Sequence, residues 1–375
     1  MGKFVTEYTV RNKKNENIPV YSVTNSQGFC SEYFGKEVAS QDKSTYKIVP
    51  KGYFAYNPSR INVGSVDWQR CEDRVIVSPL YNVFSVSNEI DRQYLYYFLR
   101  SDLGRQMIRD KASGSVRDNL KLEMLKELTI PNISLTEQKY CVSVLDKLLL
   151  LILLRQQELQ QLDELVKSRF IELFGMPGAD DFDWGLVPLG SVCHINPKKS
   201  QDPRLGSGIE VSFVPMPAVT EHGEIDATSI KEYDEVKTGF TYFAENDVLF
   251  AKITPCMENG KGAVARGLHN GIGFGSTEFH VLRPISGKTN PYWIYMLTAF
   301  PQFREDAANN MTGSAGQRRV PASYLENYRV AVPPIELQEQ FAAFVEQTDK
   351  SKLVVHKSLE KLETLKKALM QKYFG

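Results

Sequence analysis

Two long stretches of the chain repeat apolar residues every three or four positions. The first runs from about Ser134 to Phe174, and the second runs from about Glu336 to Phe374. This spacing is close to the 3.5-residue step of a coiled-coil seam, so we expect two long amphipathic helices. The first would be roughly 60 Å long. The residues expected to pack along the seam are Leu145, Leu149, Ile152, Leu159, Val166, Val355, Leu359, Leu362 and Leu369.

The two predicted helices begin and end with similar sequences. Residues 130–138 and 332–340 share a proline near the start and a Leu-x-Glu-Gln pattern at the end, and both helices finish in Phe-Gly. Ser134 and Glu137 have the spacing of a capping box. A repeat distance of roughly 200 residues is too long for a solenoid and indicates a duplicated globular unit with a helix attached.

The segments before the two helices, 1–130 and 176–332, have the same order of elements. Each contains an aromatic or apolar strand followed by a polar loop (57–65 and 252–262), then a helix (92–111 and 291–310), then a break rich in glycine and serine (113–117 and 312–320). Asp91 can cap the first of these helices.

The predicted fold class is therefore α+β, with two globular domains of mixed β-sheet and helices. The two long helices pair most simply with each other, and the connection between them allows them to run antiparallel as a coiled-coil spacer with pseudo-twofold symmetry. The predicted domains are residues 1–130, 131–175, 176–332 and 333–375. A fixed spacer between two similar domains suits the reading of two separated sites on DNA.

The first domain departs from the second at its start. The second opens with Trp184–Gly190, and the first has no matching sequence. Two alternatives are open: the first domain is shortened, or it begins with a divergent strand between Phe4 and Val10.

Composition narrows the class of protein. The chain of 375 residues has 45 Lys and Arg against 45 Asp and Glu, so its net charge does not point to nucleic acid or membrane. The longest apolar run, Leu148–Leu154, is much shorter than the roughly 18 residues of a membrane span. One helix cannot cover this run, so we expect a domain or another subunit to pack on it. Five scattered cysteines suit reduced thiols in a cytoplasmic protein.

No short motif predicts a catalytic or metal site. Asp226 with Glu235 and Lys237 is loosely nuclease-like, but a charged strand surface is the favoured interpretation. Pro255 stands where a phosphate loop ending in Gly260-Lys261-Gly262 would need its first glycine. The five histidines lack metal-ligand spacing. We therefore predict that the chain is not an enzyme and binds no metal.

The order of elements, the sequence before each long helix, the Gly-Ser breaks and the Phe-Gly ends resemble the specificity subunit of type I restriction-modification systems. The resemblance covers nearly the whole chain and is strongest from Val187 to Gly375. It implies that each globular domain is a target recognition domain for one half of a split double-stranded DNA sequence. It also implies that the helices set the gap and dock two methyltransferase subunits. S-adenosylmethionine, ATP and Mg would then be bound by methyltransferase and restriction subunits, with no cofactor on this chain.

Base readout favours Arg, Lys, Asn and Gln in loops. Residues 1–130 hold 19 basic and 15 acidic residues, and residues 176–332 hold 14 and 18, so we expect partners to supply much of the phosphate affinity. The candidates for DNA contact lie in the paired loops and breaks: Asn57, Ser59, Arg60, Asn62, Ser115, Arg117, Lys252, Thr254, Asn259, Lys261, Gln317, Arg318 and Arg319.

Two other classes of protein stay open. One is a scaffold that uses paired helices to bridge protein partners through its globular ends. The duplicated strand with a polar, basic loop argues against it. The other is a fused restriction enzyme, which the lack of a complete catalytic motif disfavours.

Overall fold

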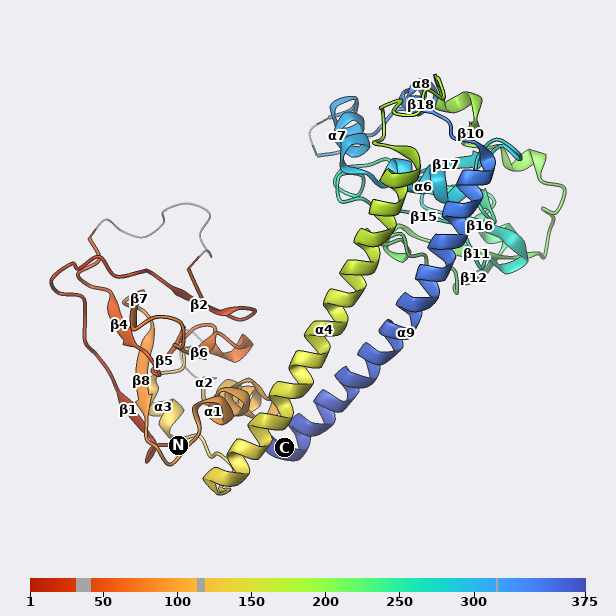
Figure 1. Cartoon of the computed structure of the whole chain (residues 1–375). Helices are drawn as coiled ribbons and strands as arrows, with labels where there is room; N and C mark the ends of the chain where they lie inside the picture. Colours follow the sequence, from red (N-terminus) through yellow and green to blue (C-terminus); the bar gives the residue numbers. More distant parts are fainter. Residues whose placement is uncertain (32–41, 113–118, 315) are drawn as a thin grey trace. The chain divides into compact units, whose positions relative to one another are not determined.

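The computed structural model describes residues 1–31, 42–112, 119–314 and 316–375 (Figure 1). The chain divides into two compact units. Unit 1 contains Met1–Gln156 and Lys357–Gly375, and unit 2 contains Gln157–His356. Each unit therefore has one globular part and a segment from each of the two long helices. Within the described ranges, none of the helices combines the length and the apolar character needed to cross a membrane.

The globular part of unit 1 is built on a four-stranded antiparallel sheet in the order β1-β8-β5-β6, with two further strand pairs, β4-β7 and β2-β3. Phe54 of β5 lies opposite Phe84 of β8, and their rings stack with centroids 5.0 Å apart. The strands are β1 Val5–Glu7, β2 Ser22–Thr24, β3 Gly28–Cys30, β4 Lys47–Pro50, β5 Phe54–Tyr56, β6 Val66–Trp68, β7 Arg74–Val77 and β8 Asn82–Val86. The helices are η1 Ile61–Val63, α1 Arg92–Arg100, α2 Asp102–Ala112 and α3 Leu122–Lys126.

The globular part of unit 2 has a sheet of the same design in the order β10-β17-β14-β15, a second four-stranded sheet β12-β11-β16-β13, and the pair β18-β9. The strands are β9 Leu186–Pro188, β10 Cys193–Ile195, β11 Glu210–Val214, β12 Ile230–Glu232, β13 Thr241–Ala244, β14 Val248–Ala251, β15 Gly262–Val264, β16 Ile272–Gly275, β17 Phe279–Pro284 and β18 Arg329–Ala331. The helices are η2 Leu189–Ser191, η3 Lys199–Gln201, η4 Met216–Ala218, α5 Tyr233–Val236, η5 His269–Gly271, α6 Pro291–Ala299, α7 Pro301–Asn309 and α8 Ala322–Asn327.

The predicted duplication is confirmed by the sheets. β1, β8, β5 and β6 occupy the same positions in their sheet as β10, β17, β14 and β15, and all neighbours in both sheets are antiparallel. β1 holds the position of β10, which confirms the divergent first strand. Unit 1 has no counterpart of β9 among its described strands.

The prediction of one continuous helix over 92–111 and another over 291–310 is wrong, and for the same reason in both units. Each is broken into two, because the backbone is extended at Ser101 (ψ 162°) and at Phe300 (ψ 141°) and interrupts the helical hydrogen bonds. In unit 2, Pro301 follows the break and has no N–H to continue the ladder.

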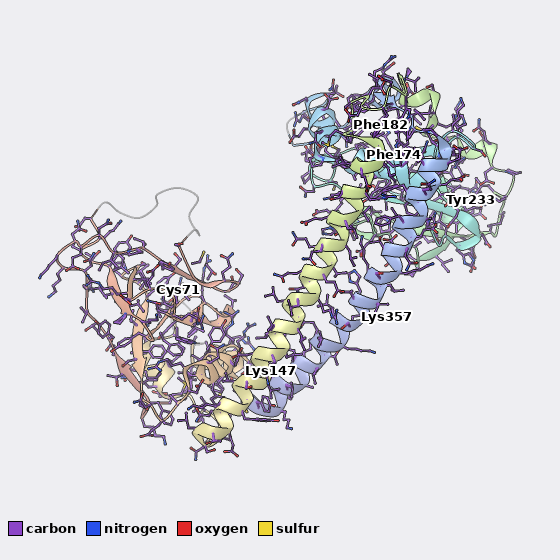
Figure 2. All side chains as sticks on the ribbon, viewed as in Figure 1. Cys71, Lys147, Phe174, Phe182, Tyr233 and Lys357 are labelled. Carbon is purple, nitrogen blue, oxygen red and sulfur yellow. The ribbon has the colours of Figure 1, made fainter. Side chains whose placement is uncertain are left out.

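The long helices are α4, Leu135–Phe174, and α9, Ile335–Phe374, with 40 residues each. Within each unit the start of one lies beside the end of the other, which confirms the antiparallel pairing. In unit 2, Phe174, which is labelled in Figure 2 at the end of α4, packs on Phe341 near the start of α9, with ring centroids 5.5 Å apart. In unit 1, Phe374 packs on Tyr94 of α1 at 5.0 Å. The two Phe-Gly ends are therefore core anchors.

The starts of the long helices are held by equivalent contacts. The capping box is confirmed, since Ser134 N donates to Glu137 Oε2 at 2.8 Å and Glu137 N donates to Ser134 Oγ at 3.3 Å. Gln138 and Gln338 are buried and tie the helix to the globular part. The Leu-x-Glu-Gln pattern aligns Gln340 with Gln138. Gln340 is exposed, and the buried residue that corresponds to Gln138 is Gln338, so the alignment suggested by the pattern is shifted by two residues.

Of the nine positions predicted for the seam, four are buried, four are half-buried and one is exposed. Leu145, Ile152, Val166 and Val355 are buried, and Leu148 is 4% exposed. Leu149 is 36% exposed and does not pack along the seam. The buried positions step by three residues from Leu145 to Leu148 and then by four to Ile152, and so they pass over Leu149. The remaining predicted positions, Leu159, Leu359, Leu362 and Leu369, are half-buried.

Candidate nucleic-acid interface

Two polar segments of unit 2 that are far apart in sequence meet at the end of β14. One is the loop 252–262 between β14 and β15, and the other is the segment 312–320 between α7 and α8. Thr254 N donates to the carbonyl of Arg318 at 3.0 Å, and Val320 N donates to the carbonyl of Lys252 at 2.9 Å. The structure thus brings together four residues predicted for DNA contact: Lys252, Thr254, Arg318 and Arg319.

Glu278, just before β17, organises this junction. Arg319 donates from Nε and Nη2 to the two carboxylate oxygens of Glu278, at 2.9 and 2.8 Å. The carbonyl of Glu278 accepts from Lys252 N at 2.9 Å. Hydrogen bonding to Arg319 lowers the pKa of Glu278, and burial lowers the pKa of the Lys252 ammonium. The junction is therefore an ordered group in which the Glu278 carboxylate binds the Arg319 side chain and the Glu278 backbone binds that of Lys252.

The other residues predicted for DNA contact in these segments differ in whether their side chains already have partners. Asn259, Gln317 and Arg318 have exposed side chains. The Thr254 hydroxyl donates to Glu258 at 2.8 Å, and Lys261 Nζ points toward the carbonyl of Met216 at 3.5 Å. The first group can reach a ligand without rearrangement, whereas the second already has partners within the unit.

Arg304 of α7 is a buried side chain that hydrogen-bonds to the backbone of the loop 252–262. Its guanidinium is almost wholly buried and lies over the Phe250 ring, 4.5 Å from the centroid. It donates to the carbonyls of Thr298 at 2.5 Å, Met257 at 2.9 Å, Gly260 at 3.3 Å and Lys261 at 3.4 Å. Burial lowers its pKa to about 10, so it stays charged at neutral pH. Three of its four acceptors belong to the loop.

His280 of β17 supports the other segment. Its Nε2 lies 2.8 Å from the carbonyl of Val320, and Asn196 Nδ2 lies 3.0 Å from its Nδ1. This arrangement suits a neutral imidazole that donates from Nε2 and accepts at Nδ1. Burial lowers the pKa of His280, which favours that neutral form. The backbone next to Arg319 is thus fixed by a buried side chain.

Unit 1 carries a loop at the equivalent position, between β5 and β6. Asn57 Oδ1 accepts from Ser59 N at 3.1 Å and Ser59 Oγ at 2.9 Å, which is an Asx turn. Arg60 and Ser59 are exposed, and Asn62 is half-buried in η1. The backbone of this loop is held by Arg100, whose Nη1 donates to the carbonyl of Gly64 at 3.1 Å. The remaining predicted residues, Ser115 and Arg117, lie outside the described residues.

Arg105 of unit 1 and Arg304 of unit 2 stand at the same position, the fourth residue of α2 and of α7. The guanidinium of Arg105 lies beside Gly64, so that a Cβ on this glycine would be 3.2 Å from Arg105 Nη2. Gly64 also has a φ of 99°, which favours glycine. Both loops therefore rest on an arginine from the helix that follows the sheet.

Sequence reasoning missed Glu278, His280, Arg304, Arg100 and Arg105. Glu278 lies just before β17 and His280 lies within it, and neither belongs to the loops and breaks from which the candidates were chosen. An arginine at the fourth position of the corresponding helix in both units was the signal that could have identified Arg105 and Arg304.

The nuclease-like residues are engaged locally and do not converge. Asp226 accepts from the Thr228 hydroxyl at 2.6 Å, and Lys237 donates to Asp234 at 2.9 Å. Among the described residues, no three His, Cys, Asp or Glu side chains could hold a metal ion.

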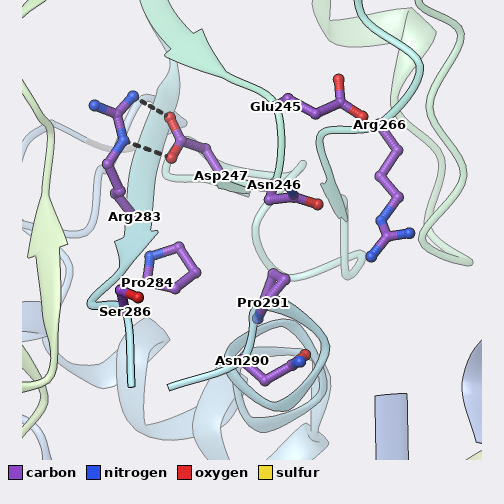
Figure 3. A pocket seen from close by; sticks show the side chains of 9 residues that line it. All are labelled: Glu245, Asn246, Asp247, Arg266, Arg283, Pro284, Ser286, Asn290 and Pro291. Carbon is purple, nitrogen blue, oxygen red and sulfur yellow. Dashed lines mark hydrogen bonds and ion pairs between the residues drawn. The ribbon is translucent and has the colours of Figure 1, made fainter. Parts of the chain in front are cut away.

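A cavity of about 460 Å³ lies at the opposite end of β14 from the loop 252–262 (Figure 3). Asp247 is buried on its wall and binds Arg283 of β17 through two hydrogen bonds, of 2.7 and 2.6 Å. Asp247 also accepts from Ala244 N at 2.8 Å. These charges therefore join β14 to β17 and the preceding turn.

Comparisons with known proteins agree with this architecture. A family model described as type I restriction modification DNA specificity domain matches residues 2–164 and 182–364. The EcoEI specificity subunit of Escherichia coli is 43% identical over 154 residues, which are 40% of this chain and 25% of that protein. The EcoAI specificity subunit of Escherichia coli is 42% identical over 160 residues, or 42% of this chain and 26% of that protein. The matched part thus spans about a quarter of each relative.

Two solved structures share the fold. One is a chain from a study of complex assembly and conformational transition in a type I R-M system. It is 19% identical with a TM-score of 0.56, and the match covers 100% of this chain and 96% of that chain. The other is the S subunit of the type I restriction-modification system from M. genitalium, with 15% identity, a TM-score of 0.53 and coverage of 99% and 94%. Since the family model matches both halves of the sequence, this chain belongs to the type I restriction-modification DNA specificity family.

Proposed function

We propose that this chain is the sequence-reading subunit of a type I restriction-modification complex. Each globular part would read one half of a bipartite double-stranded DNA target. The observation that carries the proposal is the meeting of the loop 252–262 with the segment 312–320 in unit 2, at the position where unit 1 presents the loop 57–65. Because the two loops differ in sequence, the two half-sites would differ as well.

The charge of the two halves supports a division of labour. Neither 1–130, with 19 basic and 15 acidic residues, nor 176–332, with 14 and 18, is the strongly basic body of a stand-alone DNA binder. Phosphate contacts supply much of the affinity of protein–DNA complexes, and base contacts supply specificity. This chain would supply mainly base contacts, and its partners would supply much of the phosphate affinity.

The long helices offer matched surfaces for two copies of a partner. Leu153 and Leu154 of α4, in unit 1, are each 49% exposed. Leu353 and Val354, at the equivalent positions of α9 in unit 2, are 54% and 68% exposed. Large apolar side chains exposed at equivalent positions are typical of a contact surface used twice. We propose that two methyltransferase subunits dock there, and that restriction subunits join the same complex.

The chemistry would belong to those partners. Methyltransferase subunits would bind S-adenosylmethionine and transfer its methyl group to the DNA, and restriction subunits would use ATP and Mg. No catalytic role is proposed for this chain. Its contribution is to select the sequence on which the partners act.

A gel-shift experiment with duplexes of random sequence tests the proposal. The chain alone and the chain assembled with its methyltransferase partner are each incubated with the pool, and the bound duplexes are sequenced. We expect the assembled complex to enrich a motif with two different halves and a gap of fixed length. Assembly without any enriched motif would refute sequence reading and would favour a scaffold that bridges proteins.

A further inference from the structure

Arg319 is the most rigidly held of the exposed cations at the junction of unit 2. Its backbone pairs with Thr312 in both directions, with N–H to O distances of 2.8 and 3.0 Å. The next residue, Val320, is buried and donates to the carbonyl of Lys252 at 2.9 Å. The position of the Arg319 backbone is therefore set from both sides.

The side chain of Arg319 is held just as firmly. A guanidinium has five N–H donors in a planar fork. Three of those of Arg319 are engaged, two with Glu278 at 2.9 and 2.8 Å and one, on Nη1, with the carbonyl of Gln317 at 3.1 Å. Among the described residues the other two, one on each terminal nitrogen, have no acceptor. The side chain is still 41% exposed, so these two donors can meet a ligand.

An arginine that donates from its two terminal nitrogens matches the O6 and N7 acceptors of guanine in the major groove, which is the commonest base-specific contact of arginine. A carboxylate that already binds the guanidinium argues against a phosphate as the ligand. The negative charge of Glu278 would repel a phosphate, whereas it holds the fork in the orientation that a planar base edge requires.

We propose that Arg319 reads a guanine in the half-site of unit 2 and that Glu278 is its positioning residue. This inference rests on the proposed function and names one base contact within it. The preceding residue, Arg318, is exposed, and no carboxylate binds its side chain among the described residues. The geometry therefore selects Arg319 rather than its neighbour.

Enrichment of random duplexes by the assembled complex tests this assignment with three variants. Arg319→Lys keeps the charge but loses the planar fork, and Glu278→Gln keeps the size of the side chain but loses the charge that orients Arg319. Glu346→Gln is the matched control, because Glu346 forms a similar pair with Arg266 at 3.0 Å in the same unit. Thermal unfolding confirms that each variant is folded.

We expect the wild-type complex to select a guanine at one position of one half-site, at least about tenfold over the other bases. In Arg319→Lys and Glu278→Gln this preference should fall below about twofold, while the rest of the motif and the other half-site are retained. Glu346→Gln should leave the whole motif unchanged.

Three results would overturn the inference. An intact motif in both variants would show that Arg319 reads no base. A uniform loss of affinity with an intact motif would assign Arg319 to a phosphate. The absence of any motif for the wild-type complex would instead remove the proposed function itself, and this inference with it.

Discussion

Gln138 and Gln338 make the same hydrogen bond at the start of the two long helices. Gln138 Oε1 accepts from the backbone N–H of Asp91, and Gln338 Oε1 accepts from that of Asn290, both at 2.8 Å. Asp91 and Asn290 are in turn the N-caps of α1 and α6. One buried amide in each unit thus joins the long helix to the helix that packs on the sheet.

Replacing either glutamine with alanine should destabilise its unit. The substitution leaves the backbone N–H of the cap residue without its acceptor and removes the donor to the carbonyl of Ile133 or Pro333. We expect a loss of about 1–3 kcal/mol in the free energy of unfolding, measured by urea denaturation. Gln340→Ala is the control, since Gln340 is exposed and should change stability by less than about 0.5 kcal/mol. A larger effect at Gln340 than at Gln338 would contradict the structural pairing.

Arg304→Met should loosen the loop 252–262. The substitution retains much of the packing on Phe250 but removes the hydrogen bonds of Arg304 to the carbonyls of Met257, Gly260 and Lys261, of which the Gly260 carbonyl has no other donor among the described residues. We expect a loss of at least about 3 kcal/mol in stability and faster hydrogen exchange at the amides of residues 256–261. Arg329→Met is the matched control, because Arg329 is exposed and makes one hydrogen bond, to the carbonyl of Leu186 at 2.7 Å. Equal protection of the loop in both variants would show that Arg304 does not hold it.

Several features of the fold follow directly from local sequence. The long helices, the capping box of Ser134 and Glu137 and the duplicated order of strands depend on periodicity and on spacing over a few residues. These signals do not depend on contacts between distant segments. They predicted the architecture and the loops that form the candidate interface.

Other features depend on contacts between segments that are distant in sequence, and local sequence does not determine these contacts. Within Leu148–Leu154 every position is apolar, so periodicity alone could not tell that Leu148 is buried and Leu149 exposed. Both Gln338 and Gln340 could match Gln138, and only the contact with Asn290 decides between them. Arg304 and Glu278 act on segments far from them in sequence, so their roles appear only when the chain is folded.

The buried His280 should make unit 2 less stable in mild acid. Burial lowers the pKa of His280 in the folded state, so the unfolded chain, with a pKa near 6.5, takes up the proton first. Stability should be complete above about pH 6.5 and should fall as the pH drops below this value toward the folded pKa. The charge of Lys252 lowers this pKa as burial does, whereas the hydrogen bond to Val320 and the charge of Glu278 raise it, and burial is the largest of these effects.

Thermal unfolding at pH 7.5 and pH 5 measures this effect. We expect His280→Gln to lose less Tm than the wild-type chain between the two conditions, by a few degrees (about 1 kcal/mol corresponds to roughly 2–4 °C in a domain of this size). His194→Gln is the control, because His194 is exposed in the neighbouring strand β10 and should leave the acid sensitivity unchanged. Identical acid sensitivity in all three proteins would exclude His280 as its source.

The exposed apolar residues of α4 and α9 should control assembly with methyltransferase. Leu153→Glu places a charge on the exposed surface in unit 1, and Leu353→Glu does the same at the equivalent position in unit 2. Both side chains are about half exposed, so the free chain should remain folded, whereas a buried charge in a protein interface is costly. Each single variant should therefore bind one methyltransferase fewer than the wild-type chain, and the double variant should bind none.

Analytical ultracentrifugation of the assembled complexes measures the number bound. Leu80→Glu is the control, because Leu80 is 79% exposed in a turn of unit 1, away from α4 and α9 in the sequence. If the double variant assembles as the wild type does, the methyltransferase docks on another surface, and the equivalence of Leu153 and Leu353 reflects only the duplication of the chain.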